Sequence, residues 1–85
     1  MRINTEHPAG NHCDVWRDGR REWWVVEVDT DEGWAEIVTL DAQGVPMLDE
    51  ARDRIVTHVE HGAFELTCRD ERLAAEYGIP FRVAA

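Results

Sequence analysis

The chain has 85 residues, and its 18 Asp and Glu outnumber 9 basic residues, all of them Arg, to give a formal net charge of -9. This length accommodates one domain, and the negative charge repels a phosphate backbone, so direct binding of DNA or RNA is not expected. Because the chain contains neither Ser nor Lys, serine hydrolases, Walker-type ATPases and Schiff-base enzymes are excluded.

The first half of the chain predicts β-structure after an N-terminal arm or loop. Residues 1–12 contain Pro, Gly and Asn and few apolar side chains, which is typical of a loop. A short extended segment follows at 13–16, and Asp18-Gly19 is a strong hairpin signal. Residues 20–29 alternate aromatic and β-branched side chains and predict one continuous strand.

The next segments predict further antiparallel strands joined by turns. Asp29 to Gly33 reads as a tight acidic turn, since Gly tolerates a positive φ and Asp side chains bond nearby amides. Alternating patterns predict three strands, at residues 34–40, 54–60 and 63–68. The sheet core is therefore expected to span 13–68.

The C-terminal part, 69–85, predicts a short helix and a tail. Thr67 and Asp70 fit the capping-box pattern, and Gly78 is placed to end the helix. The expected fold class is mainly β: a small antiparallel meander or SH3-like barrel of four to five strands with a short C-terminal helix.

A zinc site is chemically conceivable but poorly supported by spacing. Cys13, His58, His61 and Cys68 are competent ligands, yet two histidines three residues apart on a strand face opposite sides. The sequence also shows no orienting group or oxyanion site for a Cys–His nucleophile. We therefore expect no metal, no cofactor and no enzymatic activity, with both thiols free in a reducing compartment.

Aromatic and Arg side chains are the candidate interface residues, because Trp and Arg are the favoured anchors of protein contacts. The Trp residues are equally expected in the core, where large rings bury much area. The interface candidates are Trp16, Trp23, Trp24, Trp34, Arg20, Arg21 and Phe81.

The segment Asp29-Thr30-Asp31-Glu32-Gly33-Trp34, followed by a strand and the turn 41–44, resembles short uncharacterised proteins of tailed bacteriophages. The similarity covers roughly residues 23–66, and the tail from Arg69 departs from it. The resemblance implies a phage setting and supplies no catalytic residues.

Two functions are consistent with these features. The first is a non-enzymatic phage or prophage protein that acts through protein–protein contacts, either as a virion accessory or assembly component or as a homo-oligomer. The second is an acidic inhibitor of a host nucleic-acid-binding enzyme that imitates nucleic acid. Its acidic surface candidates are Asp29, Asp31, Glu32, Asp49, Glu50 and Asp53. Without an apolar run at the N-terminus or a membrane-length apolar stretch, the expected location is the host bacterial cytoplasm or a virion, with no membrane partner.

Overall fold

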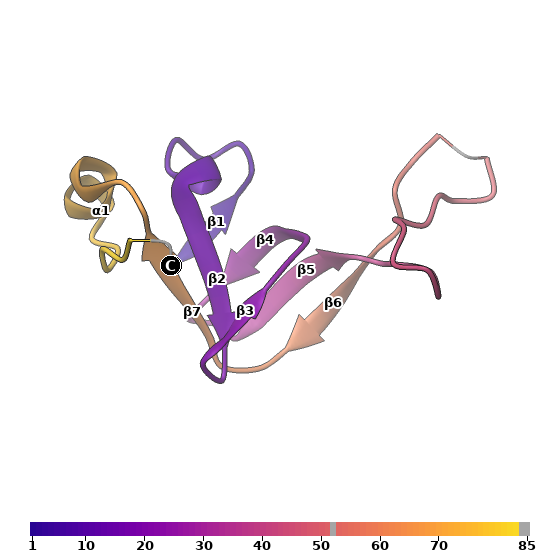
Figure 1. Ribbon diagram of the computed structural model, residues 1–85, viewed down its shortest axis with the longest axis horizontal. Helices are drawn as coiled ribbons and strands as arrows, with labels where there is room; N and C mark the ends of the chain where they lie inside the picture. Colours follow the sequence, from indigo (N-terminus) through magenta and orange to yellow (C-terminus); the bar gives the residue numbers. More distant parts are fainter. Residues whose placement is uncertain (52, 84–85) are drawn as a thin grey trace.

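The protein is mainly β, with one short helix near the C-terminus (Figure 1). The computed structural model describes residues 1–51 and 53–83. The elements in chain order are β1 (Arg2–Asn4), the 3₁₀ turn η1 (Gly10–His12), β2 (Cys13–Arg17), β3 (Arg20–Glu22), β4 (Val25–Asp29), β5 (Trp34–Val38), β6 (Thr57–His61), β7 (Phe64–Cys68) and α1 (Glu71–Tyr77). In these residues no helix is long and apolar enough to cross a membrane.

The strands form two antiparallel sheets. One has four strands in the order β1-β4-β5-β6, and the other has three in the order β3-β2-β7. The predicted mainly β fold with a C-terminal helix is confirmed, but the described residues form seven strands where four to five were expected. Their pairings make two sheets and do not show a closed barrel.

The segment 20–29, expected to be one strand, is divided between the two sheets. β3 belongs to the smaller sheet and β4 to the larger one. Between them Trp24 adopts φ 65, in the left-handed region that a bulky side chain rarely enters. This backbone reversal lets one run of β-forming residues supply strands to both sheets.

The turn at Asp18-Gly19 forms as the sequence predicts. Asp18 has φ 52 and Gly19 has φ 78, and the register pairs Arg17 with Arg20 on either side. Two consecutive positive φ angles define the type I′ turn, whose twist matches that of the flanking strands. The hairpin therefore fixes the register between β2 and β3.

The core lies between the inner faces of the two sheets and contains no Trp among its buried members. In β7, Phe64, Leu66 and Cys68 all face inward, as the alternation predicts. The buried hydrophobic residues are Ile3, Ala9, Val15, Val28, Ala35, Ile37, Phe64, Leu66, Cys68, Ala74 and Ile79. The expectation of a core built around Trp rings is wrong, because aliphatic side chains and Phe64 fill the core.

The N-terminal segment is more ordered than the arm or loop expected for residues 1–12. β1 pairs with β4, placing Ile3 opposite Val28 in the core. Asn4 then turns the chain, since its Oδ1 accepts bonds from the backbone N–H groups of Glu6 and His7 at 2.9 and 3.1 Å. The polar residues that suggested a loop form this turn.

Asp70 caps the helix α1, and the prediction that Thr67 would cap it is wrong. Asp70 Oδ1 accepts a bond from the Leu73 N–H at 3.0 Å, while Thr67 is still within β7. Gly78 ends the helix with φ 67, as predicted. The chain then returns to the sheet, where the Pro80 carbonyl accepts a bond from the Cys68 N–H.

Candidate interaction surfaces

The outer face of the smaller sheet carries a cluster of Arg and Trp side chains, called here the Arg–Trp face. It consists of Asp14, Trp16, Arg21, Trp23, Arg69 and Arg82, which line one shallow groove together with Val83. The guanidinium of Arg21 lies 4.1 Å from the centre of the Trp23 ring, and that of Arg82 lies 4.0 Å from the centre of the Trp16 ring. Both arrangements are cation–π contacts.

The charge on this face is positive, although the whole chain is acidic. Asp14 is 5% exposed, and its carboxylate lies 2.7 Å from Arg21 and 3.4 Å from Arg69. Two arginines thus pair with one buried aspartate, and Arg82 lines the same groove. Trp23 is 66% exposed beside them, so the face offers a flat apolar ring bordered by cations.

The Arg–Trp face gathers only some of the interface residues that the sequence predicts. Trp16, Trp23 and Arg21 meet there, whereas Trp34 lies on the larger sheet, 5.2 Å from the Arg2 guanidinium. Trp24 is placed at the end of β5, where its carbonyl accepts a bond from the Val38 N–H.

The other two predicted residues lie elsewhere again. Arg20 lies beside the hairpin turn at 18–19, on the exposed side of β3. Phe81 pairs with Cys68 in a parallel bridge and remains 46% exposed. The seven predicted residues therefore do not form one surface.

Sequence reasoning missed Arg69 and Arg82. Both lie in the segment predicted as helix and tail, far along the chain from Trp16. The parallel bridge between Cys68 and Phe81 brings the tail beside β7 and so places Arg82 over the ring of Trp16. No local pattern in the sequence signals this pairing, because it is a long-range contact.

The second surface is the segment 39–56, which projects from the sheets between β5 and β6 and is called here the β5–β6 projection (Figure 1). Three backbone bonds of 2.9 Å close its base: Thr39 N–H to the Val56 carbonyl, Met47 N–H to the Thr39 carbonyl, and Val56 N–H to the Met47 carbonyl. Beyond these bonds, Asp41 orders the loop 41–45 by accepting bonds from the N–H groups of Gln43 and Val45.

The β5–β6 projection exposes large apolar side chains. The exposed fractions are 54% for Val45, 42% for Met47, 51% for Leu48 and 55% for Ile55. These residues are absent from the core that the two sheets share. Grouped exposure of apolar side chains is unusual on a protein surface and makes the projection a candidate interaction surface. The sequence pattern places Ile55 in a strand and allows one helical turn from Leu48 to Asp53, whereas the described residues of that stretch contain no helix.

The free edge of β6 is adjacent to the projection. Two bonds flank this strand and join it to the larger sheet: Thr39 N–H to the Val56 carbonyl, and Gly62 N–H to the Gly33 carbonyl. Hydrogen-bonded pairs alternate along antiparallel strands, so the bonds from β6 to β5 fall at His58 and Glu60. The N–H and C=O groups of Thr57, Val59 and His61 therefore point toward the free edge.

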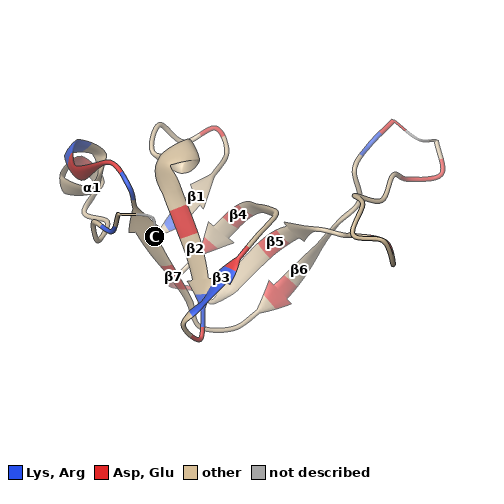
Figure 2. Cartoon of the chain, in the orientation of Figure 1, with Lys and Arg blue, Asp and Glu red and all other residues tan. Residues whose placement is uncertain are grey.

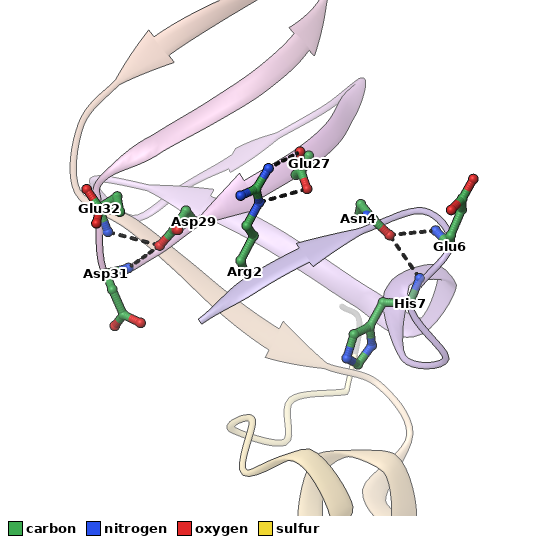
Figure 3. A network of polar contacts seen from close by, with 8 residues as sticks. All are labelled: Arg2, Asn4, Glu6, His7, Glu27, Asp29, Asp31 and Glu32. Atoms are coloured by element: carbon green, nitrogen blue, oxygen red, sulfur yellow. Dashed lines mark hydrogen bonds and ion pairs between the residues drawn. The ribbon is translucent and has the colours of Figure 1, made fainter.

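The six acidic candidates fall into two groups, one on each side of β5 in the chain, and Figure 2 shows further Asp and Glu on the strands and on α1. Asp29, Asp31 and Glu32 belong to the turn before β5, and Asp49, Glu50 and Asp53 belong to the projection after it. In the turn, Asp29 Oδ1 accepts the N–H groups of Asp31 and Glu32 at 3.0 and 2.9 Å, as Figure 3 shows. The inhibitor hypothesis stays a prediction that no contact in the structure favours.

Arg2 and Glu27 pair on the outer face of the larger sheet (Figure 3). The Nε and Nη2 atoms of Arg2 donate to the two Glu27 oxygens at 3.0 and 3.2 Å. These bonds from Arg2 hold the pKa of the Glu27 carboxyl below its ordinary value. This part of the acidic surface is therefore partly neutralised by the protein itself.

The four candidate zinc ligands are not brought together. Within 1–51 and 53–83, no group of three or more His, Cys, Asp or Glu side chains is placed to hold a metal ion. His58 and His61 lie on opposite faces of β6, whereas Cys13 and Cys68 pair directly between β2 and β7. The two cysteines are free thiols. Burial and the adjoining Cys68 thiol raise the pKa of Cys13 to about 12.

Comparisons with known proteins do not assign the chain to a family. No family model matches the sequence, and no match was found among curated proteins or solved structures. A function is therefore argued from the exposed surfaces described above.

Proposed function

We propose that this chain is a non-enzymatic phage or prophage protein that works through protein–protein contacts and associates with further copies of itself, as an accessory or assembly component of a virion. The observation that supports it is the β5–β6 projection, which holds four large apolar side chains in water. The resemblance of the turn 29–34 to phage proteins supports the setting, in the host cytoplasm or the virion.

The free edge of β6 lies next to the projection, and it favours a second copy of this chain as the partner. Two copies of β6 that pair antiparallel about Val59 place His58 of each strand opposite Glu60 of the other. The pairing therefore contains two His58–Glu60 contacts. Each is an ion pair when the histidine is protonated and a hydrogen bond when it is neutral. The projection adjoins the first residue of β6, so in this arrangement it lies next to the neighbouring copy.

Sedimentation velocity over a wide concentration range tests the proposal. We expect the wild-type chain to associate and the variant Val45→Thr/Met47→Gln/Leu48→Gln/Ile55→Thr to remain monomeric with an unchanged far-UV spectrum. The control Ala42→Gln/Gln43→Thr alters exposed residues of the same projection and is expected to associate normally. A wild-type chain that stays monomeric at every concentration contradicts the proposed self-association.

A further inference from the structure

Cys13 and Cys68 lie directly opposite each other on adjacent strands. The register of β2 and β7 pairs Cys13 with Cys68, at the first residue of one strand and the last of the other. The two strands lie side by side in Figure 1. Residues that are paired in this way point to the same face of the sheet, so both thiols enter the space between the two sheets.

The backbone bonds around the pair show that it belongs to the closer kind of antiparallel pair. The Cys68 N–H donates to the Pro80 carbonyl at 2.8 Å, and the Cys68 carbonyl accepts from the Arg82 N–H at 2.9 Å. The neighbouring pair, His12 and Arg69, is the hydrogen-bonded one, because the Arg69 N–H donates to the His12 carbonyl at 2.8 Å. Cys13 and Cys68 are thus a non-hydrogen-bonded pair.

This geometry suits a disulfide bond. In non-hydrogen-bonded pairs the Cα atoms are about 4.5 Å apart, and disulfides join Cα atoms separated by about 4.4–6.8 Å. The Cys68 Sγ donates to the Asp70 carbonyl at 3.4 Å, so the side chain rotates toward Cys13 when the disulfide bond forms. The strand register itself already supplies a Cα separation of this kind.

Only one of the two cysteines is accessible to a reagent in solution. Cys68 is fully buried, whereas Cys13 is half-buried and lines a pocket of about 170 Å³. A small reagent therefore reaches Cys13 first, and Cys68 is placed to react only with a group that is already attached to Cys13. Cys13 is thus placed as the attacking thiol and Cys68 as the resolving one, and the raised pKa of Cys13 makes the first attack slow at pH 7.

We propose that Cys13 and Cys68 form a site of reversible oxidation, which a low-molecular-weight disulfide converts to an intramolecular cross-strand disulfide. The Cys13 thiolate attacks one sulfur of the reagent, forms a mixed disulfide and releases one small thiol. Cys68 then attacks the Cys13 sulfur and releases the second small thiol, which takes up the Cys68 proton. The two cysteines lose two electrons and two protons, and the reagent gains them as two thiols.

The cross-link fixes more than the two strands. It encloses most of the chain between its ends, so it restricts the unfolded state strongly. Cys68 also holds the C-terminal segment through its bonds to Pro80 and Arg82, and Arg82 covers Trp16 on the Arg–Trp face. Oxidation therefore stiffens the sheet on which that face is built. The proposal does not depend on the proposed self-association.

Intact-mass spectrometry after prolonged incubation with cystamine at pH 9, where more of Cys13 is thiolate than at pH 7, followed by alkylation of the remaining thiols, tests the proposal. We expect the wild-type chain to lose both alkylatable thiols without keeping cysteamine, and its Tm to rise by about 10 °C. Cys68→Ser is expected to keep one cysteamine on Cys13, and Cys13→Ser is expected to react only when unfolded. Circular dichroism shows whether each variant folds.

Other products overturn the proposal. These are a stable mixed disulfide on Cys13 of the wild-type chain, a disulfide between two chains, or a folded chain that does not react while the unfolded chain does. Wild-type chain unfolded in urea is the control, because it shows whether both thiols can react with cystamine. This comparison of folded and unfolded wild-type chain decides the test even if a serine variant fails to fold.

Discussion

Arg17 on β2 pairs with Glu60 on β6, with its Nη2 2.7 Å from the Glu60 Oε1, and this partly exposed contact joins the two sheets. The Nε of the same guanidinium donates to Glu22 at 2.7 Å. On the other side of Glu60, its Oε2 lies 2.7 Å from the His58 Nε2. Bonds from His58 and Arg17 hold the pKa of the Glu60 carboxyl below its ordinary value.

This pairing predicts how stability changes at acid pH. Because the folded-state pKa of Glu60 lies below its unfolded value, its contribution is complete above the unfolded pKa and is lost as the pH falls through the folded pKa. Glu60→Gln is expected to lower the free energy of unfolding at pH 7 by less than about 1 kcal/mol, since the pair is partly exposed. The difference from wild type should then shrink below the ordinary Glu pKa.

Urea denaturation of both proteins across this pH range measures the effect. Glu65→Gln is a suitable control, because Glu65 is an exposed residue on β7. A Glu60→Gln difference that persists unchanged at the lowest pH at which both proteins fold would show that the ion pair is not its cause.

Trp24 provides a test of the backbone reversal between the sheets. At φ 65 every residue other than glycine has a strained backbone, at a cost of roughly 1 kcal/mol. Trp24→Gly is therefore expected to be more stable than Trp24→Ala by about 1 kcal/mol. At ordinary strand positions alanine is the more stable of the two. Equal stability of these variants, measured by thermal unfolding, would mean that the left-handed conformation is not kept.

The same residue shows where sequence reasoning reached its limit. The pattern of residues 20–29 correctly indicates β-structure, because local alternation reflects the pleat of a strand. Its division at Trp24 depends on two sheets competing for one segment, and no local preference of Trp predicts a positive φ. The turn at Asp18-Gly19 was predictable, since its residue types alone select the type I′ geometry.

The candidate surfaces were predictable only in part, for a similar reason. Trp16, Trp23 and Arg21 are close in the chain, and hairpin pairing between β2 and β3 keeps them close in space. Arg82 joins them through the tail, and Ile55 belongs to a projection although its alternation resembles a strand. Alternation indicates that a segment is extended, but it does not identify a partner strand.

Val59 tests the edge of β6 as the contact between copies. Its N–H points away from β5, so Val59→Pro removes a group on the free edge and no bond within the sheet. We expect a nearly unchanged Tm and at least about tenfold weaker self-association. His58→Pro is the contrasting variant, because its N–H faces Ile37 and its loss should lower the Tm. If Val59→Pro associates as tightly as wild type, the contact lies elsewhere on the chain.

Cys13 predicts a pH profile for thiol reactivity. With a pKa raised to about 12 by burial and by the neighbouring Cys68 thiol, Cys13 is almost entirely protonated at pH 7, and only the thiolate is nucleophilic. The rate of alkylation by iodoacetamide is therefore expected to rise about tenfold for each pH unit between 7 and 9. Cys68→Ser removes the neighbouring thiol, so alkylation of Cys13 should be faster in this variant at each pH. A rate in wild type that levels off near pH 8 would show an ordinary exposed thiol, and Cys13 would then not be held against Cys68 as the strand register requires.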